Sequence, residues 1–234
     1  MAKLRLACHL IQWGGEQNRD PEKVLREVAE AGWEGVEGYG VKSADELVAM
    51  ATLARRYGLH WVNMGGPNSI DTVRYNITLG NDAAEAVWTS RRDFGGDHPS
   101  GADIERAVHS FSETLAFCQA HSVKCFHHAH LWTLIETVGD AERLLGAAPG
   151  LWLLLDTGHL LAGGSDPLAV FRSPILRQRI AHVHLKDFHA DDPGTWNHRT
   201  HKFGVQGRFA ELGAGNMGLD VRAVLKGLEG VGYD

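Results

Sequence analysis

Histidine and carboxylate side chains recur in three short segments of the sequence, where together they could bind a divalent metal ion. The first segment, FHHAHLWTLIET, contains His128, His130 and Glu136, and the second, LLLDTGHLLAGG, contains Asp156 and His159. The third, HVHLKD, spans residues 182–187 and adds two histidines, a lysine and an aspartate. Imidazole and carboxylate ligands suit Mn, Co, Mg, Fe or Zn, and the segments offer no thiolate that would select Zn or Cu.

The aspartate of the second segment raises a question of burial. The apolar run Leu151–Leu155 is typical of a strand buried on both faces, and Asp156 follows it directly. A buried ionised carboxylate costs several kcal/mol unless a partner compensates it. The partner could be a metal ion. It could also be an arginine, or the backbone of the following turn if Asp156 is a structural cap.

Short apolar segments alternate with amphipathic ones along the whole chain, which favours a parallel sheet covered by helices. An open doubly wound sheet has this alternation too. We nevertheless predict a TIM (β/α)8-type barrel, because polar residues gather where several strands end, as they do in barrel active sites. These polar residues are His9, Glu37, Asn63, His128, Asp156 and His184. The predicted strands are Leu4–Leu10, Gly35–Tyr39, His60–Met64, Glu85–Thr89, Val123–His128, Leu151–Leu155 and Ile180–His184.

Capping residues and helical spacing predict the helices between these strands. Asp20-Pro21 opens one helix, and Ser43 opens another with a capping box. Asp103–His121 is predicted as one continuous helix, because its apolar residues keep helical spacing throughout. Further helices are expected within residues 68–82, 137–145, 166–171 and 220–228, and the least regular part is the polar loop 188–207.

The predicted strands number seven, so the barrel lacks its eighth strand in this chain. We expect a single domain over residues 1–234 that is incomplete at its C-terminal end. The first and seventh strands would then present unpaired edges, which favour association, and a homo-oligomer is one expectation.

The composition excludes several classes of partner. The net charge is −6 and no run of Lys or Arg is present, which argues against binding to nucleic acid or to an anionic membrane surface. No apolar stretch reaches membrane-spanning length, and the N-terminus lacks a signal-peptide pattern. The three cysteines form no CxxC motif and cannot all pair, so reduced thiols in the cytoplasm are the simplest interpretation.

At this point the sequence resembles the xylose isomerase-like TIM-barrel superfamily, in particular its sugar-phosphate isomerase/epimerase and inosose dehydratase branches. The motifs that carry the resemblance are LIQWGG, FHHAH with TLIET, LLLDTGHLLAGG, HVHLKD and ELGAGNMGLD. It extends from about residue 4 to the end of the chain. In this family one divalent ion lies at the barrel mouth, held by two glutamates, an aspartate and a histidine, and the final glutamate comes from the eighth strand.

The resemblance implies roles for particular residues. Asp156 and His184 match metal ligands and Glu136 is the choice for the first glutamate, although His128 stands where other branches carry that residue. Glu136, His159 and Lys186 are the predicted catalytic residues. Substrate binding is assigned to His9, Glu37, His128, His130, His182 and Arg208, with His182 also expected to support His184. Trp13 and Trp132 could wall the pocket, and core packing is the alternative for both.

The implied activity is that of a metal-dependent isomerase or epimerase of a sugar, sugar phosphate or related polyol carbonyl compound, acting through an enediolate. An inosose dehydratase-like lyase is the alternative within the family. Two other classes remain. An abasic-site endonuclease would need a basic groove that the charge does not favour, and a non-catalytic barrel would have Asp156 bonded to protein groups alone.

Overall fold

The computed structural model describes residues 4–233, which form two compact units. The first comprises residues 4–87 and 116–125, and the second comprises residues 88–115 and 126–233. The chain passes between the units within helix α6 (Ser112–Ala120) and within strand β5 (Lys124–His128). The single-domain organisation of the chain stays a prediction.

The first unit contains a parallel three-stranded sheet in the order β1 (Ala7–His9), β2 (Gly35–Glu37) and β3 (His60–Trp61). Its other elements are η1 (Leu10–Trp13), α1 (Glu16–Arg19), α2 (Pro21–Glu30), α3 (Ala44–Arg56), α4 (Ser69–Leu79) and β4 (Ala83–Val87). Asp20 and Ser43 cap α2 and α3 with their side chains, as the sequence predicts. Apolar residues of the helices and strands, among them Val28, Val36 and Trp61, form one buried core.

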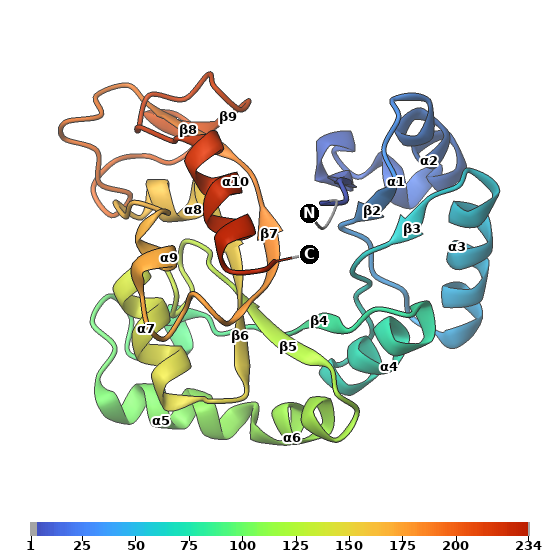
Figure 1. The fold of residues 1–234 in the computed structure, drawn as a ribbon, viewed down its shortest axis with the longest axis horizontal. Coiled ribbons are helices and arrows are strands. Elements are labelled where there is room, and N and C mark those ends of the chain that lie inside the picture. The colour runs from blue at the N-terminus through green and yellow to red at the C-terminus, as the bar shows by residue number, and fades with distance from the viewer. Residues whose placement is uncertain (1–3, 234) are drawn as a thin grey trace. The chain divides into compact units, whose positions relative to one another are not determined.

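In the second unit, strands β5, β6 (Leu151–Asp156) and β7 (Ile180–His184) are neighbours in that order, and Figure 1 shows helix α8 (Thr157–Ala162) continuing from the end of β6. An antiparallel pair, β8 (Asp187–Ala190) with β9 (Gly207–Ala210), encloses the polar loop. The remaining elements are η2 (Arg91–Asp93), α5 (Gly101–Ser110), α7 (Val138–Ala147), α9 (Ala169–Arg172) and α10 (Val221–Gly230).

The pairing of β6 with β7 is parallel and contains one irregularity. Leu153 pairs with Ile180, whereas the next residue, Leu154, pairs with His182, so that Ala181 is an extra residue on β7. Beyond this bulge the register continues to its end, where Asp156 lies opposite His184. The bulge therefore sets which β7 side chain accompanies Asp156.

Three expectations about the elements need correction. The continuous helix expected over 103–121 is two helices, α5 and α6, which are separated at Phe111. The segment after Asp156 is a helix rather than a turn, and the polar loop lies between two short strands that the sequence pattern did not reveal. Among the described helices, none combines the length and apolar character that a membrane crossing requires.

Candidate metal and substrate site

The site is built around Asp156, the last residue of β6. Its side chain is fully buried, and Oδ2 lies 3.3 Å from Nδ1 of His184 at the end of β7. Oδ2 also lies 3.0 Å from Nε2 of His128, at the end of β5, and 2.7 Å from Nζ of Lys186. Three adjacent strands thus bring one carboxylate, two imidazoles and one ammonium group together, as predicted for Asp156 and His184.

The second oxygen of Asp156 has a structural role. Oδ1 accepts the backbone N–H of His159 at 2.9 Å and so caps the N-terminus of α8. The carboxylate therefore stabilises a helix start with one oxygen and holds the polar cluster with the other. Of the partners that the sequence left open for Asp156, the structure shows the backbone cap, and the metal ion stays a prediction.

Asp156 is held in its ionised form. Burial raises the pKa of Asp156, but hydrogen bonds from His128 and His184 and the positive charge of Lys186 outweigh this effect, and the pKa lies well below its usual value. A buried anion surrounded by imidazoles and an ammonium group attracts cations and hydrogen-bond donors.

Two further imidazoles, His130 and His159, lie against each other with ring centroids 3.6 Å apart. Burial lowers the pKa of His130 to about 4 and that of His159 to about 2, so both rings are neutral near pH 7. Nδ1 of His130 donates to the carbonyl of Leu131 at 2.7 Å, which leaves Nε2 as an acceptor. Nδ1 of His159 accepts the N–H of Leu131 at 3.2 Å, which places the proton of the neutral ring on Nε2. The pair thus offers one acceptor and one donor.

The donor set of this cluster fits a divalent metal ion. In the second unit, His128, Asp156 and His159 can each offer a ligand atom within 4.8 Å of the others. The separations of 3.0 and 3.3 Å between Asp156 Oδ2 and the nitrogens of His128 and His184 match the roughly 3.0–3.4 Å expected between two ligands about 2.1 Å from one ion. Because Nδ1 of His159 accepts a hydrogen bond and its Nε2 therefore carries the proton, His184 is the better third ligand.

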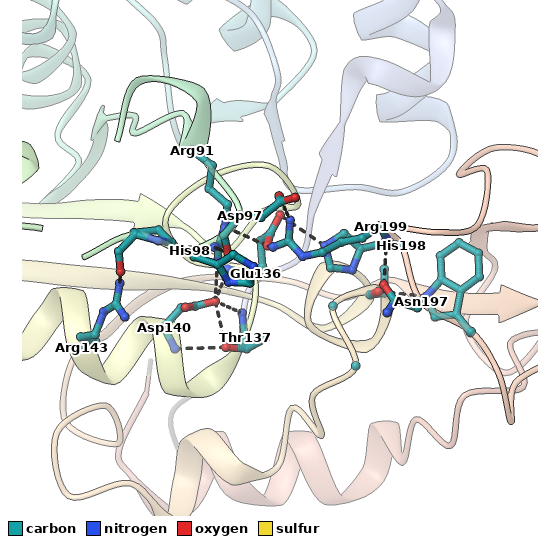
Figure 2. A pocket seen from close by; sticks show the side chains of 15 residues that line it. Arg91, Asp97, His98, Glu136, Thr137, Asp140, Arg143, Asn197, His198 and Arg199 are labelled. Atoms are coloured by element: carbon teal, nitrogen blue, oxygen red, sulfur yellow. Dashed lines mark hydrogen bonds and ion pairs between the residues drawn. The ribbon is translucent and has the colours of Figure 1, made fainter. Parts of the chain in front are cut away.

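Glu136 lies in a second polar cluster (Figure 2). Its carboxylate contacts the guanidinium of Arg91 at 2.8 Å and that of Arg199, and it accepts the N–H of Trp132 at 2.6 Å. Burial raises the pKa of Glu136, but the hydrogen bonds from His198 and the backbone of Trp132, together with the charge of Arg91, lower it overall. Both oxygens of this side chain are thus occupied by protein groups, and its assignment as a metal ligand stays a prediction.

This second cluster lines a cavity of about 560 Å³. Arg91 is one of the lining residues and donates to Asp140 at 2.7 Å and to the carbonyl of Thr133 at 2.9 Å. Asp140 in turn completes a capping box with Thr137 at the start of α7. The Arg91–Glu136 pair was missed by the sequence analysis, because an ion pair between residues so distant in the chain leaves no local pattern.

Four further residues, His9, Glu37, His182 and Arg208, were predicted to bind substrate. His9 and Glu37 pair in register in the first unit, where the His9 ring accepts the N–H of Ile11 at 3.1 Å. His182 stacks on Phe126 with ring centroids 5.4 Å apart and lies next to His184 on β7. Arg208 is an exposed residue of β9 that faces Asp191 at 3.5 Å. The roles predicted for these four residues stay predictions.

Comparison with known proteins identifies the family. Residues 25–234 match the model of the xylose isomerase-like TIM barrel, so this chain belongs to that family, and the predicted resemblance and fold class are confirmed.

Among curated proteins, the chain is 42% identical over 72 residues to an inosose dehydratase of Clostridium tetani, a match that covers 30% of this chain and 24% of that protein. It is also 35% identical over 114 residues to an inosose dehydratase of Geobacillus kaustophilus, covering 44% of this chain and 35% of that protein. The matched segments therefore represent a minor part of the length of these relatives.

Solved structures share the fold over nearly the whole chain. The probable 3-DHS dehydratase AsbF of Bacillus anthracis has a TM-score of 0.71 at 16% identity, covering 97% of this chain and 89% of that one. D-psicose 3-epimerase of Clostridium cellulolyticum, solved with D-tagatose, has a TM-score of 0.67 at 14% identity, covering 99% and 82%. A Mycobacterium smegmatis protein of the family, in complex with magnesium, has a TM-score of 0.63 at 16% identity, covering 91% and 78%.

Proposed function

We propose that this chain is a divalent-metal-dependent enzyme that moves a proton at the carbon next to the carbonyl of a polyhydroxylated compound. The observation that carries the proposal is the buried, ionised Asp156, shared at 2.7–3.3 Å by Lys186, His128 and His184. These groups lie at the C-terminal ends of parallel strands, where enzymes with this fold place their chemistry. Sugar-converting neighbours and dehydratase relatives support the same type of reaction.

His128, Asp156 and His184 are the proposed metal ligands. When bound there, a divalent ion would polarise a carbonyl and a neighbouring hydroxyl group of the substrate. Lys186 brings its ammonium group to the same carboxylate at 2.7 Å, from where it can donate to an oxygen that gains negative charge as the proton leaves carbon. Nε2–H of His159 can donate to a second substrate oxygen, and Nε2 of His130, the free acceptor of the pair, is the proposed base that takes the proton from carbon.

The fate of the carbanion-like intermediate decides the overall reaction. Return of the proton to the same carbon gives epimerisation, the reaction type of several structural neighbours. Its return to the neighbouring carbon gives isomerisation. Loss of a β-hydroxyl group gives dehydration, and the inosose dehydratase relatives specifically favour this second outcome. Both outcomes share the first step.

The proposal is tested by measuring that first step directly. The metal-loaded protein is incubated in D2O with ketohexoses and with inososes, and deuterium in the recovered substrate and product is followed by NMR and mass spectrometry. We expect exchange next to the carbonyl that disappears after chelation and returns with added Mn²⁺, Co²⁺ or Mg²⁺. A product lighter by one water identifies the dehydratase. Exchange that is equally fast without metal would contradict the proposed function.

Glu136→Gln separates the predicted ligand role of this residue from a structural one. We expect the bound metal per chain to stay unchanged, because protein donors already occupy both oxygens, and the free energy of unfolding to fall by about 1–3 kcal/mol as the contacts to the arginines weaken. Elemental analysis and chemical denaturation measure the two quantities. Loss of the metal with unchanged stability would instead establish Glu136 as a ligand.

The proposed location of this protein is the cytoplasm, as the sequence predicts. All three cysteines, Cys8, Cys118 and Cys125, are free thiols, which supports the proposed cytoplasmic location. A carbohydrate-like small molecule remains the proposed partner, and self-association stays a prediction.

A further inference from the structure

Trp132 has a backbone conformation that its residue type disfavours. Its φ is +67°, in the left-handed region, and among the described non-glycine residues only Ser122 shares this property. A residue with a large side chain loses free energy in this conformation, so the surroundings must impose it. Such outliers cluster at functional sites, where the strained geometry places a side chain.

The second polar cluster imposes the conformation. The N–H of Trp132 donates to Glu136 at 2.6 Å, and its carbonyl accepts the N–H of Arg91 at 2.9 Å. The side chains of Arg91 and Glu136 are themselves joined at 2.8 Å, and both are nearly fully buried. The two residues of this ion pair therefore hold both peptide groups that flank Trp132, Glu136 through its carboxylate and Arg91 through its backbone N–H.

The side chain of Trp132 is not buried in the core. Trp132 is 49% exposed, and Trp88 is 56% exposed. The two rings lie 6.4 and 5.2 Å from the ring of His130, which stacks on His159. Phe203, from the polar loop, meets Trp132 edge-on at 5.5 Å. Two half-exposed indoles thus accompany the imidazole pair of the Asp156 cluster.

Exposed indole surface is costly in water and well suited to the C–H face of a polyhydroxylated ring, because that face is the apolar part of such a molecule. We propose that Trp132 is a substrate-binding, specificity-determining residue whose indole packs against the C–H face of the substrate, and that Glu136 and Arg91 position it. This inference rests on the proposed function and adds the residue that selects the substrate. The buried Arg91–Glu136 pair would then contribute to substrate recognition by positioning Trp132.

The test compares Trp132→Gly and Trp132→Phe with the wild-type protein. Glycine adopts the left-handed conformation freely and removes the ring, so we expect the midpoint of thermal unfolding to stay the same or rise. In the exchange assay, KM should increase about tenfold or more with kcat changed much less, because the lost contact is one of binding. Phenylalanine restores part of the apolar surface and should give an intermediate KM.

Trp33→Ala, which removes a partly exposed tryptophan of the first unit, is the control and should leave KM unchanged. Substrate-induced changes in tryptophan fluorescence give a second readout that does not depend on turnover, and they should shrink in Trp132→Gly. An active wild-type protein with an unaltered KM in Trp132→Gly would overturn this inference alone. A lower unfolding midpoint with unchanged KM would likewise show a purely structural tryptophan. Absence of exchange in the wild-type protein would overturn the proposed function and this inference with it.

Discussion

Replacing Asp156 with asparagine is expected to reduce the rate of deuterium exchange by on the order of 10³-fold and to remove the bound metal ion. Asparagine keeps the size of the side chain but loses the charge that the two imidazoles and Lys186 share. It is also a good helix N-cap, so the hydrogen bond to the N–H of His159 should persist and the fold with it. Exchange rates, elemental analysis and thermal unfolding measure the three effects.

The control for this substitution is Asp166→Asn, which removes an exposed carboxylate paired with Arg172 on the surface. We expect metal content and exchange rate to remain those of the wild-type protein in this variant. An Asp156→Asn protein that is folded, metal-bound and active would remove the basis of the proposed function.

Arg91→Met is expected to lower the free energy of unfolding by about 3–5 kcal/mol, the largest effect on stability that we predict. The substitution leaves Glu136, which is 1% exposed, without its buried partner and also removes the donors to Asp140 and Thr133. Arg199 remains near Glu136, but its side chain is 28% exposed and compensates less. Chemical denaturation followed by circular dichroism measures the change.

The neighbouring Arg92 provides a matched control, because it belongs to the same short helix and is exposed. Arg92→Met should change the stability by no more than about 0.5 kcal/mol. In the double variant with Glu136→Gln, the loss should be smaller than the sum of the two single losses, because the uncompensated charge is gone. Additive losses would show that Arg91 and Glu136 do not interact energetically.

The sequence predicted the part of the site that depends on strand order and periodicity. The apolar run Leu151–Leu155 marked a buried strand, and alternation along residues 180–184 placed His182 and His184 on one face. With both strands parallel and adjacent, Asp156 and His184 had to meet at the same end of the sheet. The bulge at Ala181, which these patterns did not reveal, sets the contact of 3.3 Å between them. The family that residues 25–234 confirm was predicted from the sequence motifs.

Other features carry no local signal. The break between α5 and α6 was invisible because the apolar residues keep helical spacing across Phe111. The start of α8 was missed because this helix is short and fully buried, so that its residues show no amphipathic helical spacing. Nothing in the sequence marks Trp132 as left-handed, since such positions usually carry glycine. The contacts that impose this conformation come from Glu136 on the same loop and from Arg91, which is distant in the chain.

The extra alanine in β7 has a consequence for how this protein tolerates length changes. Ala181 is the unpaired residue, so a chain without it would still place Leu154 opposite His182 and Asp156 opposite His184. If Ala181 instead paired with Leu154 in the register set by Leu153 and Ile180, Asp156 would face Val183, and both histidines of the strand would lie on the opposite side of the sheet. Every residue of the cluster would still be present, and the proposed metal site would nevertheless be lost.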